Sequence, residues 1–193
     1  MAVKKLAWIL LLALAACASV PERADNAERE AARERYLSAQ TDWAFNGRLA
    51  YSHDGKGGSA KIQWRQSGPV SDVRIDAPLA LGSVRLRLEG DMARVFDASG
   101  RELKSGRPEV LLEELLQMPM PSGDWVGGLR AYWAMAPELT SVASQGRVDM
   151  ADWSWRYEQW RDEPVRLPVK IEITRPGSRV RIVVDQWQGV SGE

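Results

Sequence analysis

Few side chains in this sequence are of types that carry covalent or metal chemistry. Cys17 is the only cysteine and His53 the only histidine, so the chain can form neither an internal disulfide nor a His/Cys zinc site. His53 comes at the start of a predicted turn and is expected to be an exposed loop residue. Glu113 and Glu114 are adjacent on a predicted helix, where neighbouring side chains point apart, which predicts solvated charges rather than a catalytic pair. The thiol of Cys17 is therefore the reactive group whose surroundings indicate a chemistry.

Motifs of the common enzyme classes are absent from the sequence. It has no Gly-x-Ser-x-Gly, no phosphate-binding loop, no dinucleotide glycine pattern and no metal-ligand spacing. We therefore predict that the protein is not an enzyme and uses no cofactor. Removing residues 1–16, whose only charges are Lys4 and Lys5, leaves 24 basic and 26 acidic residues, a net charge of −2. This balance predicts no nucleic-acid binding, which needs a basic excess.

Residues 1–16 are typical of a secretory signal peptide. A short basic start precedes an apolar run from Leu6 to Ala16, which is shorter than the roughly 20 residues of a membrane span. The run ends in LAAC at 14–17, which resembles the bacterial lipobox. That resemblance implies that Cys17 becomes the lipidated N-terminus, with an S-diacylglycerol and an N-palmitoyl group. The alternative is an ordinary signal peptide followed by a chance cysteine.

The residues after the cysteine indicate which membrane holds the lipid anchor and how the chain is organised into segments. In lipobox proteins an aspartate directly after the cysteine favours the inner membrane, and Ala18 stands there instead. The resemblance thus implies a lipid anchor in the outer membrane, at its periplasmic face. Residues 22–40 are rich in Ala, Glu and Arg, which predicts a tether leading into a helix. The expected organisation is a signal peptide at 1–16, an anchor, tether and N-terminal helix at 17–40, and one domain at 41–190.

From Trp43 onward the hydrophobic pattern predicts strands. Pairs such as Ile62/Trp64 alternate with polar residues to about residue 97, and the alternation returns over 153–184. Turn residues separate the alternating runs, which predicts an antiparallel meander of eight or more strands.

Helices are predicted in the middle of this meander. Residues 108–118 begin with a proline, which suits the first helical position. A second, short helix is predicted at roughly 123–134, with Ser122 as its cap. The apolar face of the first helix is predicted to consist of Val110, Leu111, Leu115 and Met118.

The expected fold is mainly β with α: an incomplete, open antiparallel β-barrel with a helical lid over an apolar cavity. If the helices fill the curl of the sheet incompletely, a cavity remains. The aromatic side chains at 153–157 share one strand face, where they either pack in the core or line such a cavity. The candidates for the apolar face, some as lining and some as packing, are Trp64, Leu86, Leu88, Trp153, Trp155, Ile171 and Ile182.

The segment between two predicted strands at 77–82 is unusual for a hairpin loop. It contains Leu79 and Leu81 between a proline and a glycine and carries no charge, although loop tips are normally polar. One interpretation is that the loop folds back and both leucines cap the core. We prefer a projecting apolar tip that inserts into a membrane.

Several short motifs, in their order along the chain, resemble the LolB family. The resemblance begins at Cys17 and, after the tether, extends from Trp43 to Trp187. It implies the half-barrel fold with a lid and an outer-membrane receptor that accepts lipoproteins from a periplasmic LolA-like carrier. Two residues, Ala80 and Leu81, intervene where the family commonly has Pro-Leu-Gly, so either leucine can be the insertion residue. The motifs are WxxxGR at 43–48, WxQSG at 64–68, the loop at 78–82, MPMP at 118–121, LR at 129–130, PVKI at 168–171 and VRIxxDxW at 180–187.

The resemblance implies a monomer whose partners are lipoprotein acyl chains, the carrier and outer-membrane lipid. Three other readings stay open at this stage. A soluble periplasmic carrier of the same fold is disfavoured by Cys17. An anchored structural lipoprotein that docks a protein partner would have no open cavity. A lipoprotein hydrolase offers no residues that could be nominated.

Overall fold

The structure is a computed structural model that describes residues 22–76, 82–133, 136–162 and 165–189. Its first element is helix α2 (Glu22–Ala39), within the range predicted to hold a helix. The compact unit Tyr36–Glu193 includes the last residues of this helix and every strand. Leu37 belongs to the core of that unit and is 1 % exposed.

Ten antiparallel strands form one sheet, in the order β6-β5-β4-β3-β2-β1-β10-β9-β8-β7. Consecutive strands are neighbours in the sheet apart from β6 and β7, which lie at opposite edges, and the first strand pairs with the last in the middle of the sheet. The two edges, β6 and β7, come directly before and after the helical segment of the chain, and the sheet does not close. The strands are β1 (Asp42–His53), β2 (Lys56–Ser67), β3 (Val70–Asp76), β4 (Ser83–Glu89), β5 (Met92–Phe96), β6 (Glu102–Gly106), β7 (Arg147–Met150), β8 (Trp153–Arg161), β9 (Leu167–Arg175) and β10 (Ser178–Gln188).

Alternating burial gives most of this sheet one apolar face. In β2 every second side chain from Ala60 to Gln66 is buried and those between are exposed. The register places Phe45 of β1 and Val73 of β3 on either side of Trp64. Buried side chains therefore form continuous rows across neighbouring strands. The predicted open antiparallel sheet is confirmed.

Gly47 allows the first and last strands to approach closely. The register between β1 and β10 shifts at Asn46/Gly47, which marks a β-bulge. A Cβ atom at position 47 would lie 2.3 Å from the carbonyl oxygen of Val183. Any larger residue would push the two strands apart at this point.

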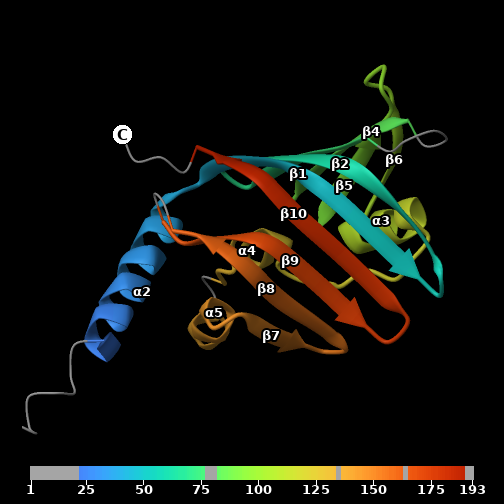
Figure 1. Cartoon of the computed structure of the whole chain (residues 1–193). Helices are drawn as coiled ribbons and strands as arrows, with labels where there is room; N and C mark the ends of the chain where they lie inside the picture. Colours follow the sequence, from blue (N-terminus) through green and yellow to red (C-terminus); the bar gives the residue numbers. More distant parts are fainter. Residues whose placement is uncertain (1–21, 77–81, 134–135, 163–164, 190–193) are drawn as a thin grey trace, which may run out of the picture. The chain divides into compact units, whose positions relative to one another are not determined.

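Helices α3 (Pro108–Leu116), α4 (Trp125–Arg130) and α5 (Pro137–Ser144) lie on one side of the sheet, behind it in Figure 1. Pro108 begins α3 as predicted. The N-cap of α4 is Asp124 rather than Ser122, because its carboxylate accepts a hydrogen bond of 2.8 Å from the backbone N–H of Gly127.

Arg130 fixes the C-terminal end of α4. Its Nη1 donates hydrogen bonds of 3.2 Å to the carbonyl oxygens of Leu37 and Gln40. Its guanidinium carbon lies 5.1 Å from the ring centroid of Trp43. The carbonyl groups at the end of α2 carry partial negative charge, so a cation is favoured there. The side chain thus joins the helical segment to the residues that lead into β1.

Candidate functional site

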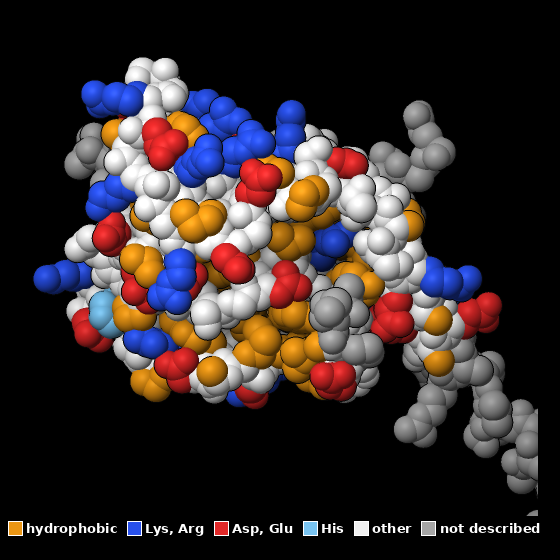
Figure 2. All heavy atoms as spheres, turned by 180° about the vertical axis from the view of Figure 1, so that it is seen from behind, with side chains coloured by type: hydrophobic (Ala, Val, Ile, Leu, Met, Phe, Trp, Pro, Cys, Tyr) orange, Lys and Arg blue, Asp and Glu red, His pale blue; other side chains and the backbone are white. Residues whose placement is uncertain are grey.

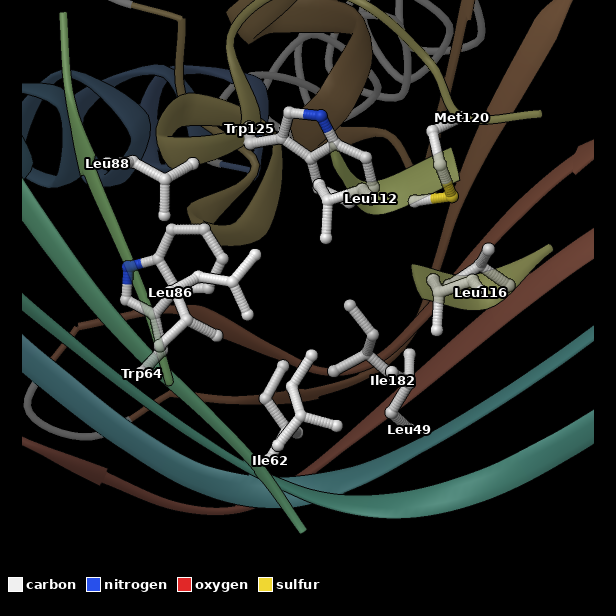
Figure 3. A pocket seen from close by; sticks show the side chains of 13 residues that line it. Leu49, Ile62, Trp64, Leu86, Leu88, Leu112, Leu116, Met120, Trp125 and Ile182 are labelled. Atoms are coloured by element: carbon white, nitrogen blue, oxygen red, sulfur yellow. The ribbon is translucent and has the colours of Figure 1, made fainter. Parts of the chain in front are cut away.

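A pocket lies between the apolar face of the sheet and helices α3 and α4. Its floor comes from strands β1 to β4 and β10, and its cover from α3, α4 and the segment between these helices (Figure 3). The empty space among the side chains is about 530 Å³, a volume that includes the open space at the mouth. The lining residues are Leu49, Ile62, Trp64, Val73, Ile75, Leu86, Leu88, Leu112, Leu116, Met120, Trp125, Val180 and Ile182.

The walls of the pocket are apolar throughout. The two tryptophans carry its only lining side-chain N–H groups, and both are directed to protein oxygens: Trp64 Nε1 lies 3.5 Å from Gln66 Oε1, and Trp125 Nε1 donates to the carbonyl oxygen of Pro121 at 3.1 Å. No lining residue is titratable. Such a site binds by excluding water from apolar ligand surface, at roughly 25 cal/mol per Å², and offers no group for acid–base chemistry.

Local hydrogen bonds hold the cover of the pocket in place. Gln117 takes a left-handed conformation, φ 53°, and ends α3. The following turn brings the backbone N–H of Met120 to within 3.1 Å of Glu113 Oε1, which accepts its hydrogen bond. These contacts direct Met120 and Trp125 toward the strands, as Figure 3 shows. Glu113 is therefore a structural acceptor, and Glu114 forms an ion pair with Lys104.

Four of the seven residues predicted for the apolar face line this pocket. Trp64, Leu86, Leu88 and Ile182 are on its strand side. The other three, Trp153, Trp155 and Ile171, do not line it. They are buried in the part of the sheet formed by β8 and β9, where they pack in the core.

The region around Trp155 is filled rather than hollow. Its ring makes edge contacts with Trp125 and Trp133, at centroid distances of 5.4 and 6.1 Å. A Cβ atom at Gly128 would lie 2.6 Å from this ring, so the glycine lets α4 sit directly on it. The hydroxyl of Tyr157 donates a 2.9 Å hydrogen bond to the carbonyl oxygen of Gly128. We call this region, built from β8, β9, α4 and α5, the packed half.

Nine lining residues were not among the candidates. Those on strands, such as Ile62, Val73 and Val180, follow the same alternation as the candidates and could have been found by it. The predicted apolar face of α3 holds only in part: Leu111 and Met118 are buried and Leu115 packs against the core, but Val110 is 38 % exposed. Leu112 and Leu116 point into the pocket instead.

His53 differs from its predicted place. It is the last residue of β1, not a loop residue, and its side chain is only 32 % exposed. Its Nδ1 lies 2.9 Å from the hydroxyl oxygen of Ser178. Cys17, Leu79 and Leu81 lie outside the described residues. Within those residues, no cluster of three or more His, Cys, Asp or Glu side chains could hold a metal ion.

Asp76, the last residue of β3, directly precedes in sequence the loop that carries the two leucines. A hydrogen bond from Ser83 lowers the pKa of its carboxyl group, and the neighbouring Arg74 lowers it further. Arg74 Nε lies 3.0 Å from Asp76 Oδ1. The β3–β4 hairpin therefore carries a charged side chain at its last pair before the loop, Asp76 opposite Ser83.

Comparison with known proteins decides the family. The model of the family described as outer membrane lipoprotein LolB matches residues 41–187. The chain belongs to the LolB family. The family resemblance seen in the motifs is thereby confirmed.

Relatives match nearly the whole chain. It is 34 % identical to the outer-membrane lipoprotein LolB of Xanthomonas oryzae pv. oryzae (strain MAFF 311018) and 32 % identical to that of Alkalilimnicola ehrlichii, with 94 % of each chain covered in both cases. The crystal structure of a LolA superfamily protein from Nitrosomonas europaea has a similar fold, with a TM-score of 0.50 and 10 % identity over 83 % of this chain and 93 % of that one. Among the described residues, no helix is long and apolar enough to span a membrane.

Proposed function

We propose that this protein is an outer-membrane receptor for lipoproteins, anchored at the periplasmic face by the lipid on Cys17. As a monomer it accepts a lipoprotein from a periplasmic LolA-like carrier, holds the acyl chains in the pocket and inserts them into the outer membrane. The pocket carries this proposal, because all thirteen side chains around it are apolar. The names of the LolB relatives support the lipoprotein character and the outer membrane.

The chemistry of the pocket fits transfer by binding alone. Exposing acyl chains to water is costly, at roughly 25 cal/mol per Å² of apolar surface. A pocket without polar groups offsets that cost for any saturated chain, whatever protein is attached to it. Transfer then needs only that the receptor bind the chains more tightly than the carrier and less tightly than the membrane. The proposal accordingly assigns the protein no catalytic residue.

The proposal that the pocket binds acyl chains can be tested by filling the pocket with a larger side chain. Leu112 points into the pocket from α3, whereas Val110 on the same helix is exposed. We expect Leu112→Trp to weaken binding of a fluorescent fatty-acyl probe by at least about tenfold, because the indole occupies the space of the chain. Val110→Trp is the matched control and should bind as the wild type does.

The same titration distinguishes the main alternative. An anchored docking lipoprotein without a lipid site would show no saturable binding of the probe in the folded wild-type protein. Binding that is saturable but equal in both tryptophan variants would place the acyl chain outside this pocket. Either result contradicts the proposal.

Insertion into the membrane is assigned to Leu79 and Leu81. Two leucine side chains could contribute roughly 3–5 kcal/mol at a bilayer interface, which is enough to bias docking and still reversible. Leu79→Glu with Leu81→Glu should leave the melting temperature and lipoprotein acceptance nearly unchanged, while transfer into liposomes fails. A large loss of stability would show instead that the leucines belong to the core. Cys17→Ala should abolish anchoring and leave acceptance intact.

A further inference from the structure

Arginines gather on the outer face of strands β2 to β5, the face opposite to the pocket. The register places Arg65, Asp72, Arg87 and Arg94 in one row across these four strands. Neighbouring strands are about 4.8 Å apart, so the row extends over roughly 14 Å. Asp72 is already bonded to Arg85, from the next position of β4 on the same face. The row therefore holds three cations whose charge no carboxylate within it offsets.

The side chains of these three arginines are exposed. Arg65, Arg87 and Arg94 form neither an ion pair nor a side-chain hydrogen bond with any part of the chain that the structure describes. Arg87 and Arg94 stand directly opposite each other on β4 and β5. Like charges in that position repel, which disfavours the pair unless an anion lies above it.

The other end of the same outer face is different. There Arg48 pairs with Asp185, and Arg147 pairs with Asp149. Glu172, only 7 % exposed, is ringed by arginines, the nearest being Arg181 at 3.0 Å. Figure 2 shows the opposite side of the molecule, with the helices, where apolar side chains gather in the lower half and basic ones toward the upper left. The excess of positive charge is local, in a chain whose formal net charge is zero.

Exposed apolar side chains accompany the basic row. Met92 precedes Arg94 by two residues on β5 and so shares its face, and it is 51 % exposed. On β6, which pairs with β5, Leu103 is 47 % exposed and is the unpaired residue of an irregularity between Glu102 and Lys104. A surface that combines basic groups with exposed apolar side chains is typical of proteins that lie on a bilayer.

We propose that the outer face of β2 to β5 docks on a membrane surface that contains anionic phospholipids. Arg65, Arg87 and Arg94 bind the phosphate groups, while Met92 and Leu103 enter the layer of the headgroups. An acidic protein surface would satisfy the arginines but would leave the two apolar side chains without a favourable partner. The proposal does not depend on what the pocket holds, and it concerns a face that contributes no residue to it.

Vesicle binding of residues 18–193, which contain every described element, tests the proposal without a lipid anchor. The probes are vesicles of phosphatidylglycerol and phosphatidylcholine in equal parts, and vesicles of phosphatidylcholine alone. The test variant is Arg65→Gln/Arg87→Gln/Arg94→Gln. Each arginine near an anionic surface contributes about fivefold in affinity, so the triple variant should lose about a hundredfold on the anionic vesicles. High salt should weaken the wild type in the same way.

The matched control changes the same number of charges elsewhere on the face, as Arg48→Gln/Arg147→Gln/Arg179→Gln. It should lose less than about threefold, and the lysine triple variant at 65, 87 and 94 should bind nearly as the wild type does. If both glutamine variants lost the same affinity for the anionic vesicles, the binding would depend only on net charge, and the proposal would be overturned. Unchanged vesicle binding in the test variant would do so too, and would favour an acidic protein as the partner of the arginines. Both variants alter exposed side chains, so an unchanged thermal melt verifies the fold.

Discussion

In both halves of this domain, helices pack on the apolar face of the sheet, but one half is filled and the other encloses a pocket. In the packed half, Trp155 reaches up from β8 and meets Gly128 of α4, so large and small side chains fit together. In the pocket half the strands present mostly aliphatic side chains toward Leu112 and Leu116 of α3, and empty space remains among these side chains. An apolar strand face is common to both halves. What decides between core and cavity is whether the length of the strand side chains matches the distance to the helix.

The largest expected effect is a difference in the loss of stability when two leucines on neighbouring helices are replaced by alanine. Leu129 of α4 is completely buried in the packed half, whereas Leu112 of α3 is half-buried beside existing empty space. Leu129→Ala should lower the free energy of unfolding by about 3–4 kcal/mol, because it leaves a new cavity. Leu112→Ala should lower it by only about 1 kcal/mol and should still bind the acyl probe. Urea denaturation measures both, and equal losses would contradict the distinction between the halves.

A smaller effect is expected where α4 touches Trp155. Gly128→Ala places a methyl group against the indole ring, and overpacking of this kind costs about 1–3 kcal/mol. Trp155→Leu in the same chain should make room for the methyl group, so the two changes should be less than additive in a double-mutant cycle. If the two changes in unfolding free energy were strictly additive, the contact between Gly128 and Trp155 would not limit the packing in this half.

The smallest effect concerns the outer edge of the pocket half. Because the hydrogen bond from Ser83 lowers the pKa of Asp76 in the folded state, ionised Asp76 stabilises the fold at neutral pH. This contribution is fully present above the unfolded pKa of about 3.9 and is lost as pH falls through the lower, folded value. Asp76→Asn should therefore be less stable than the wild type at neutral pH, and the difference should shrink below about pH 4. Urea midpoints that keep a constant difference down to about pH 2 would exclude this linkage.

Much of the sheet could be predicted from the sequence, because alternation reports directly on a face that is buried. The strands that alternation missed are the edges. β6 has almost no buried side chain, so no period of two appears in Glu102–Gly106, and β7 is only four residues long. Helix α5 was also missed, and α4 (Trp125–Arg130) is shorter than the helix predicted at roughly 123–134.

The site was less predictable than the sheet for a physical reason. Trp64 and Trp155 have the same pattern in sequence, each on an alternating strand, yet one lines the pocket and the other fills the core. The difference comes from the residue that each meets on a helix, which no local pattern contains. The signal that could have separated them is the glycine pair in α4, since a helix with a glycine can approach an aromatic ring that a helix with leucines cannot.

The pairing of the first strand with the last has a consequence for how the chain folds during synthesis. Strands β1 to β6 can form hairpins with one another as they emerge, and so can β7 to β10. The two groups join only when β10 finds β1, with contacts such as Arg48 to Asp185 across 137 residues of chain. Closing so long a loop is slow, and it cannot begin before the ribosome has made almost the entire protein. Until then β1 is an open edge with one apolar side, which can pair wrongly with other chains until the final strand is available.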